Sequence, residues 1–423
     1  MNSDTIVATY LIETPFSIER AAEALAGEQS TGTFLSVPGE TDELKARYRA
    51  RVMELVPLES LSKPSLPGSR SPTTSSENKE YHQARVTIGF PIETVGTSLS
   101  TVTATVLGNL FELSEFSGLR LLDIDFPQAF ADRYSGPQFG VDGTRELSGV
   151  ADRPIIGTII KPSVGLSPEQ TSHLVSELAE ADIDFIKDDE LMANPPHSPF
   201  ENRVEAIMRV INAHADKTGK KVMYAFNLSD DIDQMLHNHD FVLKSGGTCV
   251  MVSLNSMGLP AVAKLRQHSQ LPIHGHRNGW GMLTRCPALG IEFAAYQKLW
   301  RLAGVDHLHV NGLGNKFWEP DESVVKSIKA CLSPMLTQPP VMPVISSGQW
   351  GGQAPETYKQ TQSIDIMYLA GGGVMAHPMG PASGVRALRQ AWESATLGLE
   401  LSEYAKTHPE LLASIETFGK RRQ

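Results

Sequence analysis

The sequence predicts an α/β protein whose main part is a (β/α)8 TIM barrel, preceded by an N-terminal α+β domain. From residue 154 onward, short apolar runs recur, each followed by a polar or glycine-rich junction and then by a helical stretch. Eight such runs alternating with helices favour a closed parallel barrel. The chain has 423 residues, 41% of them hydrophobic, and a single core usually stops growing at about 250–300 residues. We therefore expect two domains, residues 1–140 and residues 141–423, the second ending in C-terminal helices.

The N-terminal domain mixes strand and helix signals. Residues 6–12 and 83–89 alternate between apolar and polar side chains, as half-buried strands do, whereas residues 17–26 have helical spacing. Residues 101–107 fit either a helix or a strand. Residues 58–80, rich in serine and proline, predict an exposed and mobile connection.

The barrel strands are predicted where apolar runs end abruptly in polar or glycine residues. In chain order they are residues 155–160, 185–187, 222–226, 249–254, 273–274, 307–309, 344–346 and 366–369. In this architecture reactive groups gather at the carboxyl ends of the strands. Nearly every predicted strand ends in such a group, so the sequence predicts a single polar mouth, as an active site requires.

The strand end at residues 184–190 is the most informative. Its apolar run ends in a lysine and three acids, Lys187, Asp188, Asp189 and Glu190. Strand alternation places Lys187 and Asp189 on one face, with Glu190 where the strand turns outward. Two carboxylates there could hold Mg²⁺, because water and substrate complete its oxygen shell. Lys187 is then either an ion-pair partner or a lysine carbamate formed with CO2. The alternative is a solvated acidic turn before a helix.

Two further lysines follow predicted strands. Lys161 comes directly after the first strand, and a lysine in a low-dielectric site beside other cations has a lowered pKa and can move protons. Lys316 lies in a glycine-rich loop after the sixth strand, which could close over a substrate and exclude water. The alternative for Lys316 is a solvated loop lysine.

Phosphate binding is predicted from an arginine, a histidine and two glycine-rich turns. Glycines let backbone N–H groups approach phosphate oxygens closely, and the loops after the seventh and eighth strands are the usual anion site of a TIM barrel. The candidate residues are Arg277, His309, Ser346, Ser347, Gly348, Gly371, Gly372 and Gly373.

Two His-x-His pairs raise the alternative of a zinc site. They are His274 with His276 and His307 with His309. No cysteine or metalloprotease spacing accompanies them. We expect instead that one histidine of each pair is packed in the core and the other lines the pocket.

Composition excludes several classes of partner. The formal net charge is -11, and the only basic cluster is the terminal run 420–422, so nucleic acid and membranes are not expected as partners. An anionic small molecule remains compatible with a local group of cations. The three cysteines, Cys249, Cys286 and Cys331, are widely spaced in apolar segments. They predict reduced core thiols in a cytoplasmic protein.

The residues in this order resemble the large subunit of ribulose-bisphosphate carboxylase, RuBisCO, and the RuBisCO-like proteins, over nearly the whole chain. The resemblance rests on residues 157–162, on residues 184–190, on the pair His276-Arg277, on His309 and on Lys316. It implies the TIM barrel and an active site at the carboxyl ends of the strands.

The resemblance also implies a cofactor and a set of catalytic residues. Carbamylated Lys187, Asp189 and Glu190 would bind Mg²⁺, with CO2 as the source of the carbamate. The residues implied to be catalytic are Lys161, Lys187, His276 and Lys316.

Substrate contacts and an oligomer follow from the same resemblance. Arg277, His309, Ser346 and the glycine run 371–373 match the family's substrate and phosphate contacts. In the first domain, Glu28, Thr33 and Asn109 lie in segments that a neighbouring subunit lends to the active site. The functional unit is therefore expected to be a homodimer or a larger assembly of dimers.

Several positions depart from the pattern of true carboxylases. Ser163 stands where those enzymes have a second lysine, Phe34 replaces a tryptophan, Ser347 a glycine and Trp280 a histidine, and the loop 310–315 has a different sequence. Losing the lysine at position 163 removes a cation that would help to polarise the substrate. Carboxylation of ribulose bisphosphate is therefore not expected.

The remaining residues resemble most the relatives that cleave 3-oxo-isoapionate 4-phosphate, a phosphorylated 3-oxo sugar acid. The reaction would be a decarboxylation or a transcarboxylase/hydrolase cleavage, and the sequence does not choose between them. One alternative is an enolase or isomerase of a methylthio-sugar phosphate in methionine salvage. Asn109 argues against this alternative, because it stands near the place where some such enolases carry a lysine base. Another alternative is a catalytically silent relative that binds a sugar phosphate.

Overall fold

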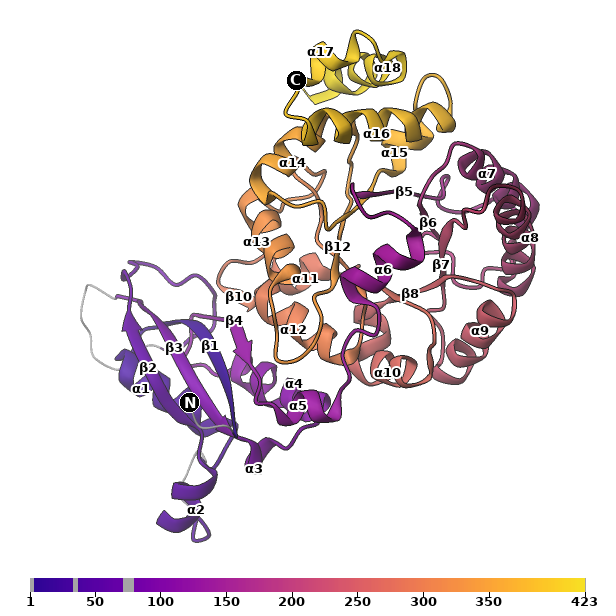
Figure 1. Cartoon of the computed structure of the whole chain (residues 1–423). Helices are drawn as coiled ribbons and strands as arrows, with labels where there is room; N and C mark the ends of the chain where they lie inside the picture. The colour runs from indigo at the N-terminus through magenta and orange to yellow at the C-terminus, as the bar shows by residue number, and fades with distance from the viewer. Residues whose placement is uncertain (1–3, 33–36, 71–79, 423) are drawn as a thin grey trace. The chain divides into compact units, whose positions relative to one another are not determined.

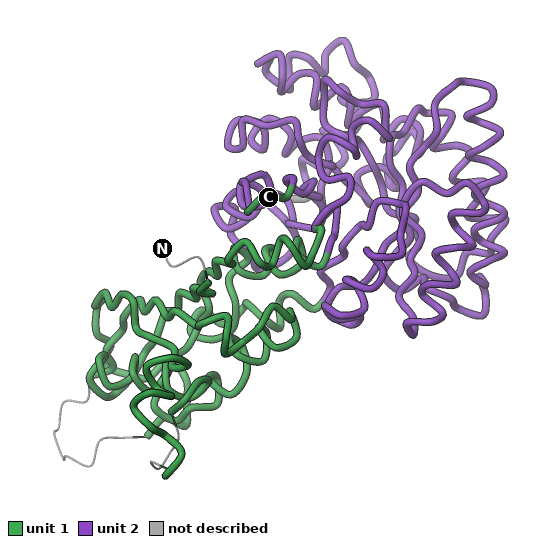
Figure 2. The backbone as a smooth tube through the Cα atoms, turned by 60° about the horizontal axis from the view of Figure 1, so that its bottom comes forward, with its two compact units in different colours: residues 1–135, 279–303, 336–338 green, residues 136–278, 304–335, 339–423 purple. Residues whose placement is uncertain are grey.

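The computed structural model describes residues 4–32, 37–70 and 80–422, which form two compact units (Figure 2). Unit 1 comprises Met1–Ser135, Gly279–Ala303 and Leu336–Gln338, and unit 2 comprises Gly136–Asn278, Gly304–Met335 and Pro339–Gln423. Both units are discontinuous in sequence, because the chain returns to unit 1 twice after first leaving it. The single boundary expected at residue 140 stays a prediction.

Unit 1 is built on a five-stranded sheet with the order β10-β4-β1-β3-β2. Its strands are β1 (Thr5–Thr14), β2 (Arg51–Pro57), β3 (His82–Pro91), β4 (Gly118–Asp125) and β10 (Leu289–Ile291). β1 pairs antiparallel with β3 and β4, whereas β10 pairs parallel with β4. The expected strands at residues 6–12 and 83–89 are the central parts of β1 and β3.

The alternation that predicted β1 reflects its burial. Ile6, Ala8, Tyr10 and Ile12 are fully buried, and the residues between them are more exposed. β4 was missed because its first four residues are all buried, which gives no alternation. β2 was missed because much of it is exposed at the sheet edge.

The helices of unit 1 include one whose nature the sequence left open. Residues 101–107 belong to a helix, α4, not to a strand, and Ser17 caps α1 by accepting a hydrogen bond from the backbone N–H of Arg20. The helices are α1 (Ile18–Glu28), α2 (Asp42–Tyr48), α3 (Ile92–Val95), α4 (Leu99–Leu107), η1 (Asn109–Glu112), α5 (Ala129–Arg133), α11 (Trp280–Thr284) and α12 (Phe293–Ala303). Residues 58–70 are largely exposed, as expected, and residues 71–79 of the same segment lie outside the described residues.

A buried arginine explains why the segment after residue 279 joins unit 1. Arg120 on β4 donates to the carbonyls of Thr284, Cys286 and Leu289 at 2.7–3.0 Å. Its Nε also donates to Glu292 at 2.7 Å. These bonds tie the turn around β10 to the edge of the sheet.

Unit 2 is a closed barrel of eight parallel strands in the order β5-β6-β7-β8-β9-β11-β12-β13 (Figure 1). They are β5 (Ile155–Ile159), β6 (Phe185–Lys187), β7 (Met223–Asn227), β8 (Cys249–Ser253), β9 (Ile273–His276), β11 (His307–His309), β12 (Met342–Ile345) and β13 (Met367–Leu369). Each of the expected runs overlaps one barrel strand. The predicted fold class is confirmed.

The barrel is filled by apolar side chains from alternate strand positions. The core cluster includes Ile155, Phe185, Met223, Ala225, Cys249, Met251, Met342, Val344, Met367 and Leu369. Gly157 is required in β5, because a Cβ atom there would lie 2.7 Å from the Phe185 carbonyl and 2.5 Å from Leu369. The core therefore fills the interior below the carboxyl ends of the strands.

Helices surround the barrel, and Figure 1 shows α7 to α10 as an outer layer around β5 to β8. The helices of unit 2 are α6 (Gly140–Ser148), α7 (Pro168–Glu180), α8 (Phe200–Thr218), α9 (Ile232–Lys244), α10 (Leu254–His268), α13 (Asp321–Leu332), η2 (Gly351–Gln353), α14 (Ala354–Thr361), α15 (Gly371–Met375), α16 (Pro381–Thr396), α17 (Leu401–Ala405), α18 (Pro409–Phe418) and η3 (Gly419–Arg422). Across the part of the chain that the structure describes, no helix is long and apolar enough to cross a membrane.

Candidate active site at the barrel mouth

Lys187 is the last residue of β6 and its side chain is buried. Its Nζ atom donates to the carbonyl of Asp188 at 2.8 Å and lies 3.6 Å from the sulfur of Met251. Burial lowers the pKa of Lys187 to about 8, against the opposing charges of Glu190 and Asp189. A substantial fraction of this lysine is therefore neutral near pH 8, and the neutral amine is the form that can add to CO2.

Asp189 lies beside Lys187, and its carboxylate accepts a hydrogen bond from a second lysine, Lys161. Lys161 Nζ donates to Asp189 Oδ2 at 2.7 Å and to Ser163 Oγ at 2.5 Å. Burial raises the pKa of Asp189, but the hydrogen bonds and charge of Lys161 outweigh it, so the net shift is downward. Asp189 is therefore ionised at neutral pH, and Ser163, the position that departs from the carboxylases, orients Lys161.

Glu190 and His276 face each other across the mouth. The Glu190 Oε2 and His276 Nε2 atoms are 3.6 Å apart. Burial lowers the pKa of His276 to about 3, with the charge of Lys187 acting in the same direction. His276 is therefore a neutral imidazole at pH 7 and can hydrogen-bond a substrate without adding charge.

Asn227, the last residue of β7, orients the two acids. Its side-chain amide donates to the carbonyl of Asp189 at 3.3 Å and to that of Glu190 at 3.1 Å. Asn227 directly follows the strand predicted at residues 222–226, and no role was predicted for it. The only sequence signal for this role was the position of an asparagine at a strand end that follows the acidic strand end at residues 184–190.

Asp188, the third acid of the run, has a different environment. It is buried, with Arg203 Nη2 at 3.3 Å, the Tyr224 hydroxyl at 2.7 Å and the backbone N–H of Asn227 at 3.0 Å. Its carboxylate is therefore a structural anchor under the mouth and is not available as a ligand.

The donor set at the mouth fits a hard divalent cation. Asp189 and Glu190 supply carboxylate oxygens, and a carbamate on Lys187 would supply another. The predicted residues thus come together at one end of the barrel, although their role as ligands stays a prediction. Among the described residues, the one group of three or more histidine, cysteine or acidic side chains close enough to share a metal is elsewhere, at His239, Asp240 and His268 on the outer helices.

The remaining barrel histidines form a hydrogen-bonded row. His274 Nε2 lies 2.8 Å from His309 Nε2, and His274 Nδ1 lies 3.3 Å from His307 Nδ1. Thr144 Oγ1 and Ser346 Oγ extend the row, at 2.9 Å from His307 and 3.2 Å from His309. Burial lowers the pKa of all three imidazoles. Their ring nitrogens are hydrogen-bonded to one another and are therefore not directed at a shared metal position, which does not favour the zinc alternative.

Arg277, predicted to bind phosphate, is paired within the protein. Its Nη2 donates to Glu319 Oε2 at 2.8 Å, and both side chains are almost fully buried. Asn311 donates to the same Glu319 oxygen at 2.5 Å, and Ser347 Oγ donates to Asn311 Oδ1 at 2.7 Å. The role of Glu319 was not predicted from the sequence. It lies in a largely exposed loop, and no motif indicates that its side chain points into the protein.

The glycine run forms the start of α15 beside Lys161. A Cβ atom on Gly371 would lie 3.6 Å from Lys161 Cε, and one on Gly373 would lie 2.5 Å from the Gln349 carbonyl. Gly372 has no neighbour within 4 Å of such an atom. Gly371 and Gly373 are therefore packed against their neighbours, whereas the space beside Gly372 is open and lies near the charged side chain of Lys161.

The loop that carries Lys316 joins the mouth at the Ser347-Gly348 turn. The backbone N–H of Lys316 donates to the Ser347 carbonyl at 3.2 Å. The Lys316 side chain is exposed, with its Nζ 5.2 Å from the ring centre of the exposed Phe317. Both interpretations of this lysine, a mobile catalytic group and a solvated residue, stay open.

The residues expected to serve a neighbouring subunit lie in unit 1. Glu28 at the end of α1 and Asn109 at the start of η1 are exposed. Thr33 and Phe34 lie outside the described residues. The homodimer therefore stays a prediction.

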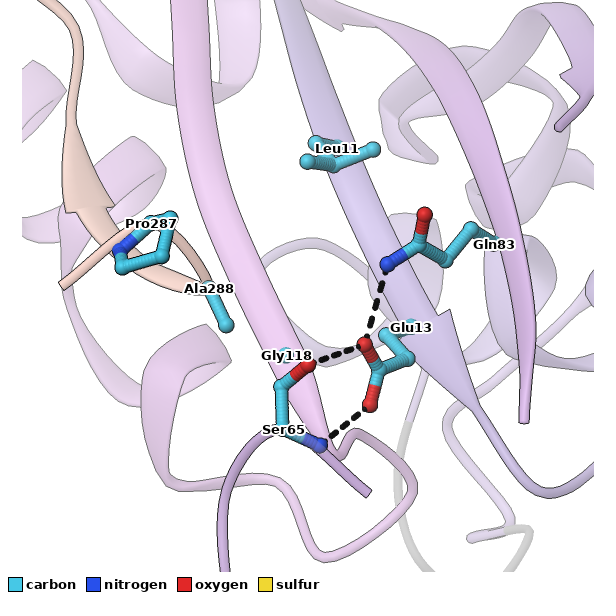
Figure 3. Close-up of a pocket in the computed structure, with 7 residues that line it drawn as sticks. All are labelled: Leu11, Glu13, Ser65, Gln83, Gly118, Pro287 and Ala288. Carbon is cyan, nitrogen blue, oxygen red and sulfur yellow. Dashed lines mark hydrogen bonds between the residues drawn. The ribbon is translucent and has the colours of Figure 1, made fainter. Parts of the chain in front are cut away.

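Unit 1 contains a cavity of about 220 Å³ at its sheet (Figure 3). Glu13 lines it and is buried, but its carboxylate accepts hydrogen bonds from Ser65, Gln83 and Ser117 at 2.6–3.0 Å. These bonds satisfy the charge of Glu13 within the protein, so its carboxylate is not available to a ligand in this cavity.

The cysteine prediction was wrong at one position. Cys249 and Cys331 are buried, as expected, but Cys286 is exposed. Cys286 follows the short helix α11 in a turn whose carbonyl groups point at Arg120. The apolar neighbours that suggested a core position belong to that turn.

The fold and the grouped lysine, acid and histidine side chains place the chain in the class of TIM-barrel proteins with a polar site at the carboxyl ends of the strands. Comparison with known proteins then identifies the family. Residues 1–130 match the ribulose bisphosphate carboxylase large chain, N-terminal domain, and residues 140–418 match its catalytic domain. The chain belongs to the RuBisCO large-chain family, which confirms the resemblance.

The chain is similar over nearly its whole length to proteins of one branch. It is 50% identical to a 3-oxo-isoapionate-4-phosphate decarboxylase of Rhizobium etli, over 98% of this chain and 99% of that protein. It is 52% identical to a 3-oxo-isoapionate-4-phosphate transcarboxylase/hydrolase of Xanthobacter autotrophicus, with the same coverage. A crystal structure of a RuBisCO-like protein from Burkholderia fungorum superposes with a TM-score of 0.90 and 44% identity, covering 98% of this chain and all of that one.

Proposed function

We propose that this protein cleaves a carbon–carbon bond in a phosphorylated 3-oxo sugar acid of the 3-oxo-isoapionate 4-phosphate type, with Mg²⁺ as cofactor. The names of relatives that are about half identical over nearly full length support this substrate class. The serine at position 163, hydrogen-bonded to Lys161 where carboxylases have a lysine, supports a reaction other than carboxylation of ribulose bisphosphate.

Carbamylated Lys187, Asp189 and Glu190 would hold the metal. When bound there, a divalent ion would polarise the oxo group and stabilise the negative charge that develops beside it. Asn227 keeps the two acids oriented through their carbonyls. The single observation that carries this proposal is the buried Lys187 with its lowered pKa next to two carboxylates.

The protein's own residues would perform the remaining steps. In a decarboxylation, the bond between the carboxylate carbon and the neighbouring carbon breaks and CO2 leaves. The electron pair of the broken bond stays on the neighbouring carbon, which forms an enolate with the oxo group. Lys161, held at Asp189 and next to Gly371, would deliver a proton to the enolate carbon. Neutral His276 would hydrogen-bond the oxo group or the departing carboxylate.

In the hydrolytic variant, water attacks the oxo carbon and gives up one proton, and the bond from that carbon to the neighbouring carbon breaks. The products are a carboxylic acid and an enolate, and the enolate carbon then takes up one proton, which balances the proton lost by the water. Lys316 would close over the substrate from its loop and polarise the carbonyl. The phosphate would lie against the backbone of Gly371–Gly373, beside Lys161.

An activity assay tests the proposal. The purified protein, with Mg²⁺ and bicarbonate, would be incubated with 3-oxo-isoapionate 4-phosphate and with methylthio-sugar phosphates, while CO2, phosphoglycerate and proton exchange are followed. Cleavage of the first substrate is expected. Proton exchange without cleavage would support the methionine-salvage alternative instead, and no reaction with any substrate would support a silent binding protein.

Replacing Lys187 tests the carbamate within the same assay. Lys187→Met is expected to abolish turnover while far-UV circular dichroism stays that of the folded protein. Lys217→Met, at an exposed position of α8, serves as the matched control and should keep full activity. Unchanged activity of Lys187→Met would remove the carbamate from the mechanism.

A further inference from the structure

The barrel mouth has two ends that differ in charge. One end holds Lys161 and the glycine run, with the open space at Gly372. The other end lies where β9, β11 and β12 finish. Its buried positively charged side chain, among the described residues named for this site, is Arg277, whereas the exposed Lys316 lies on the loop that meets the Ser347-Gly348 turn. An anion buried there would depend on Arg277.

The charge of Arg277 is already balanced by Glu319. The two side chains are 5% and 2% exposed and their nitrogen and oxygen are 2.8 Å apart. His309 lies at the same end, and burial lowers its pKa well below the usual value, so it adds no charge at neutral pH. The cluster of Arg277, Glu319, Asn311, Ser347 and His309 is therefore neutral overall.

Glu319 is also held firmly in place. Besides Arg277 and Asn311, Ser323 Oγ donates to its second oxygen at 2.9 Å. Asn311 and Ser347 both have positive φ angles, 64° and 74°, and hydrogen-bond each other. Residues other than glycine rarely adopt this conformation, and it persists where the surroundings impose it. The Glu319 carboxylate thus occupies the Nη2 side of Arg277, so a phosphate at this arginine would lie close to a fixed negative charge.

We propose that Glu319 makes this end of the mouth select an uncharged, hydroxyl-bearing substrate end and reject a second phosphate. The protein would accordingly bind sugar acid monophosphates, with their single phosphate at the glycine run, in preference to bisphosphates. A phosphate dianion at Arg277 would have to displace a buried, three-fold hydrogen-bonded carboxylate or lie beside its like charge. Asn311, Ser346 and Ser347 offer amide and hydroxyl groups that suit sugar hydroxyls. This inference rests on the proposed function, whose substrate class it narrows.

Binding of two inert sugar-alcohol phosphates tests the inference without any turnover. Ribitol 5-phosphate and ribitol 1,5-bisphosphate would be titrated by calorimetry into the protein with Mg²⁺ and bicarbonate. In the unmodified protein the bisphosphate is expected to bind no more than about 3-fold more tightly than the monophosphate. A bisphosphate that binds 10-fold or more tightly in the unmodified protein would overturn the inference, whether or not any variant folds.

Glu319→Gln supplies the second arm, because it removes the charge while keeping the size and an acceptor oxygen. The variant is expected to bind the bisphosphate at least 10-fold more tightly than the unmodified protein does, with the affinity for the monophosphate changed less than 3-fold. Glu322→Gln, three residues along and exposed, is the matched control and should change neither affinity. The double variant Arg277→Met with Glu319→Gln should lose the gain. If folded Glu319→Gln shows no gain, Glu319 does not set the preference.

The outcomes separate this inference from the proposed function. If the protein does not cleave 3-oxo-isoapionate 4-phosphate but shows the expected binding ratios, only the proposed reaction fails. If it cleaves that substrate and also binds the bisphosphate 10-fold more tightly, only the inference about Glu319 fails.

Discussion

Arg203 on α8 is not a predicted substrate contact, yet its removal should destabilise the barrel mouth. Its side chain is fully buried and donates to the carbonyls of Ser198, Met192 and Ala193 at 2.6–2.7 Å and to Asp188 at 3.3 Å. One guanidinium thus holds the loop after β6 and balances the charge of the acid between Lys187 and Asp189.

The expected magnitude for Arg203→Met follows from these contacts. Removing one partner of a buried ion pair costs about 3–5 kcal/mol. Each buried carbonyl that loses its donor adds about 1–3 kcal/mol unless water replaces it. The Tyr224 hydroxyl and the Asn227 backbone N–H still bond Asp188, which limits the loss. We expect a net decrease in the free energy of unfolding of about 4 kcal/mol or more, and its size depends on how many of the three carbonyls water reaches in the variant.

Urea unfolding followed by circular dichroism measures the loss, and hydrogen exchange of residues 188–203 localises it. Arg209→Met, at an exposed position of the same helix, is the matched control and should change stability by less than about 0.5 kcal/mol. Combining Arg203→Met with Asp188→Asn should cost less than the sum of the two, by about 1–3 kcal/mol, because the pair is then removed together. If Arg203→Met were as stable as the control, with unchanged exchange, the buried pair would not hold this loop.

Three further predictions concern other parts of the chain. With the metal site proposed above, Asn227→Ala should raise the Mg²⁺ concentration needed for half-maximal turnover about 10–100-fold, because it removes the hydrogen bonds to the backbone carbonyls of Asp189 and Glu190; an unchanged Mg²⁺ dependence would contradict this. Burial raises the pKa of Glu13, but hydrogen bonds from neighbours such as Ser65 outweigh it and the net shift is downward, so Glu13 stabilises the fold above its unfolded pKa of about 4.3 and loses this effect as the pH falls through its folded value. Urea unfolding of Glu13→Gln should accordingly depend less on pH below about 5 than that of the unmodified protein, and parallel pH curves would refute this. Finally, a thiol reagent should label Cys286 rapidly in the folded protein and Cys249 only after unfolding, because only Cys286 is exposed; equal labelling rates would contradict this.

Much of the site could be predicted because its residues are tied to strand ends. Apolar runs mark the barrel strands, and the carboxyl ends of parallel strands in a closed barrel must meet at one mouth. Lys161 and Asp189 therefore had to lie close together, and they are 2.7 Å apart. The same reasoning brought Glu190 and His276 to the mouth.

The sequence by itself determined the barrel, its eight strands and the side chains that gather at its mouth, because these follow from local apolar patterns and from strand alternation. Only the tertiary structure decided which charges are cancelled. Asp188 meets Arg203, fifteen residues on, and Arg277 meets Glu319, forty-two residues on, across loops that carry no periodic signal. Pairing of buried charges depends on distances in space between distant segments, and no local pattern encodes those distances.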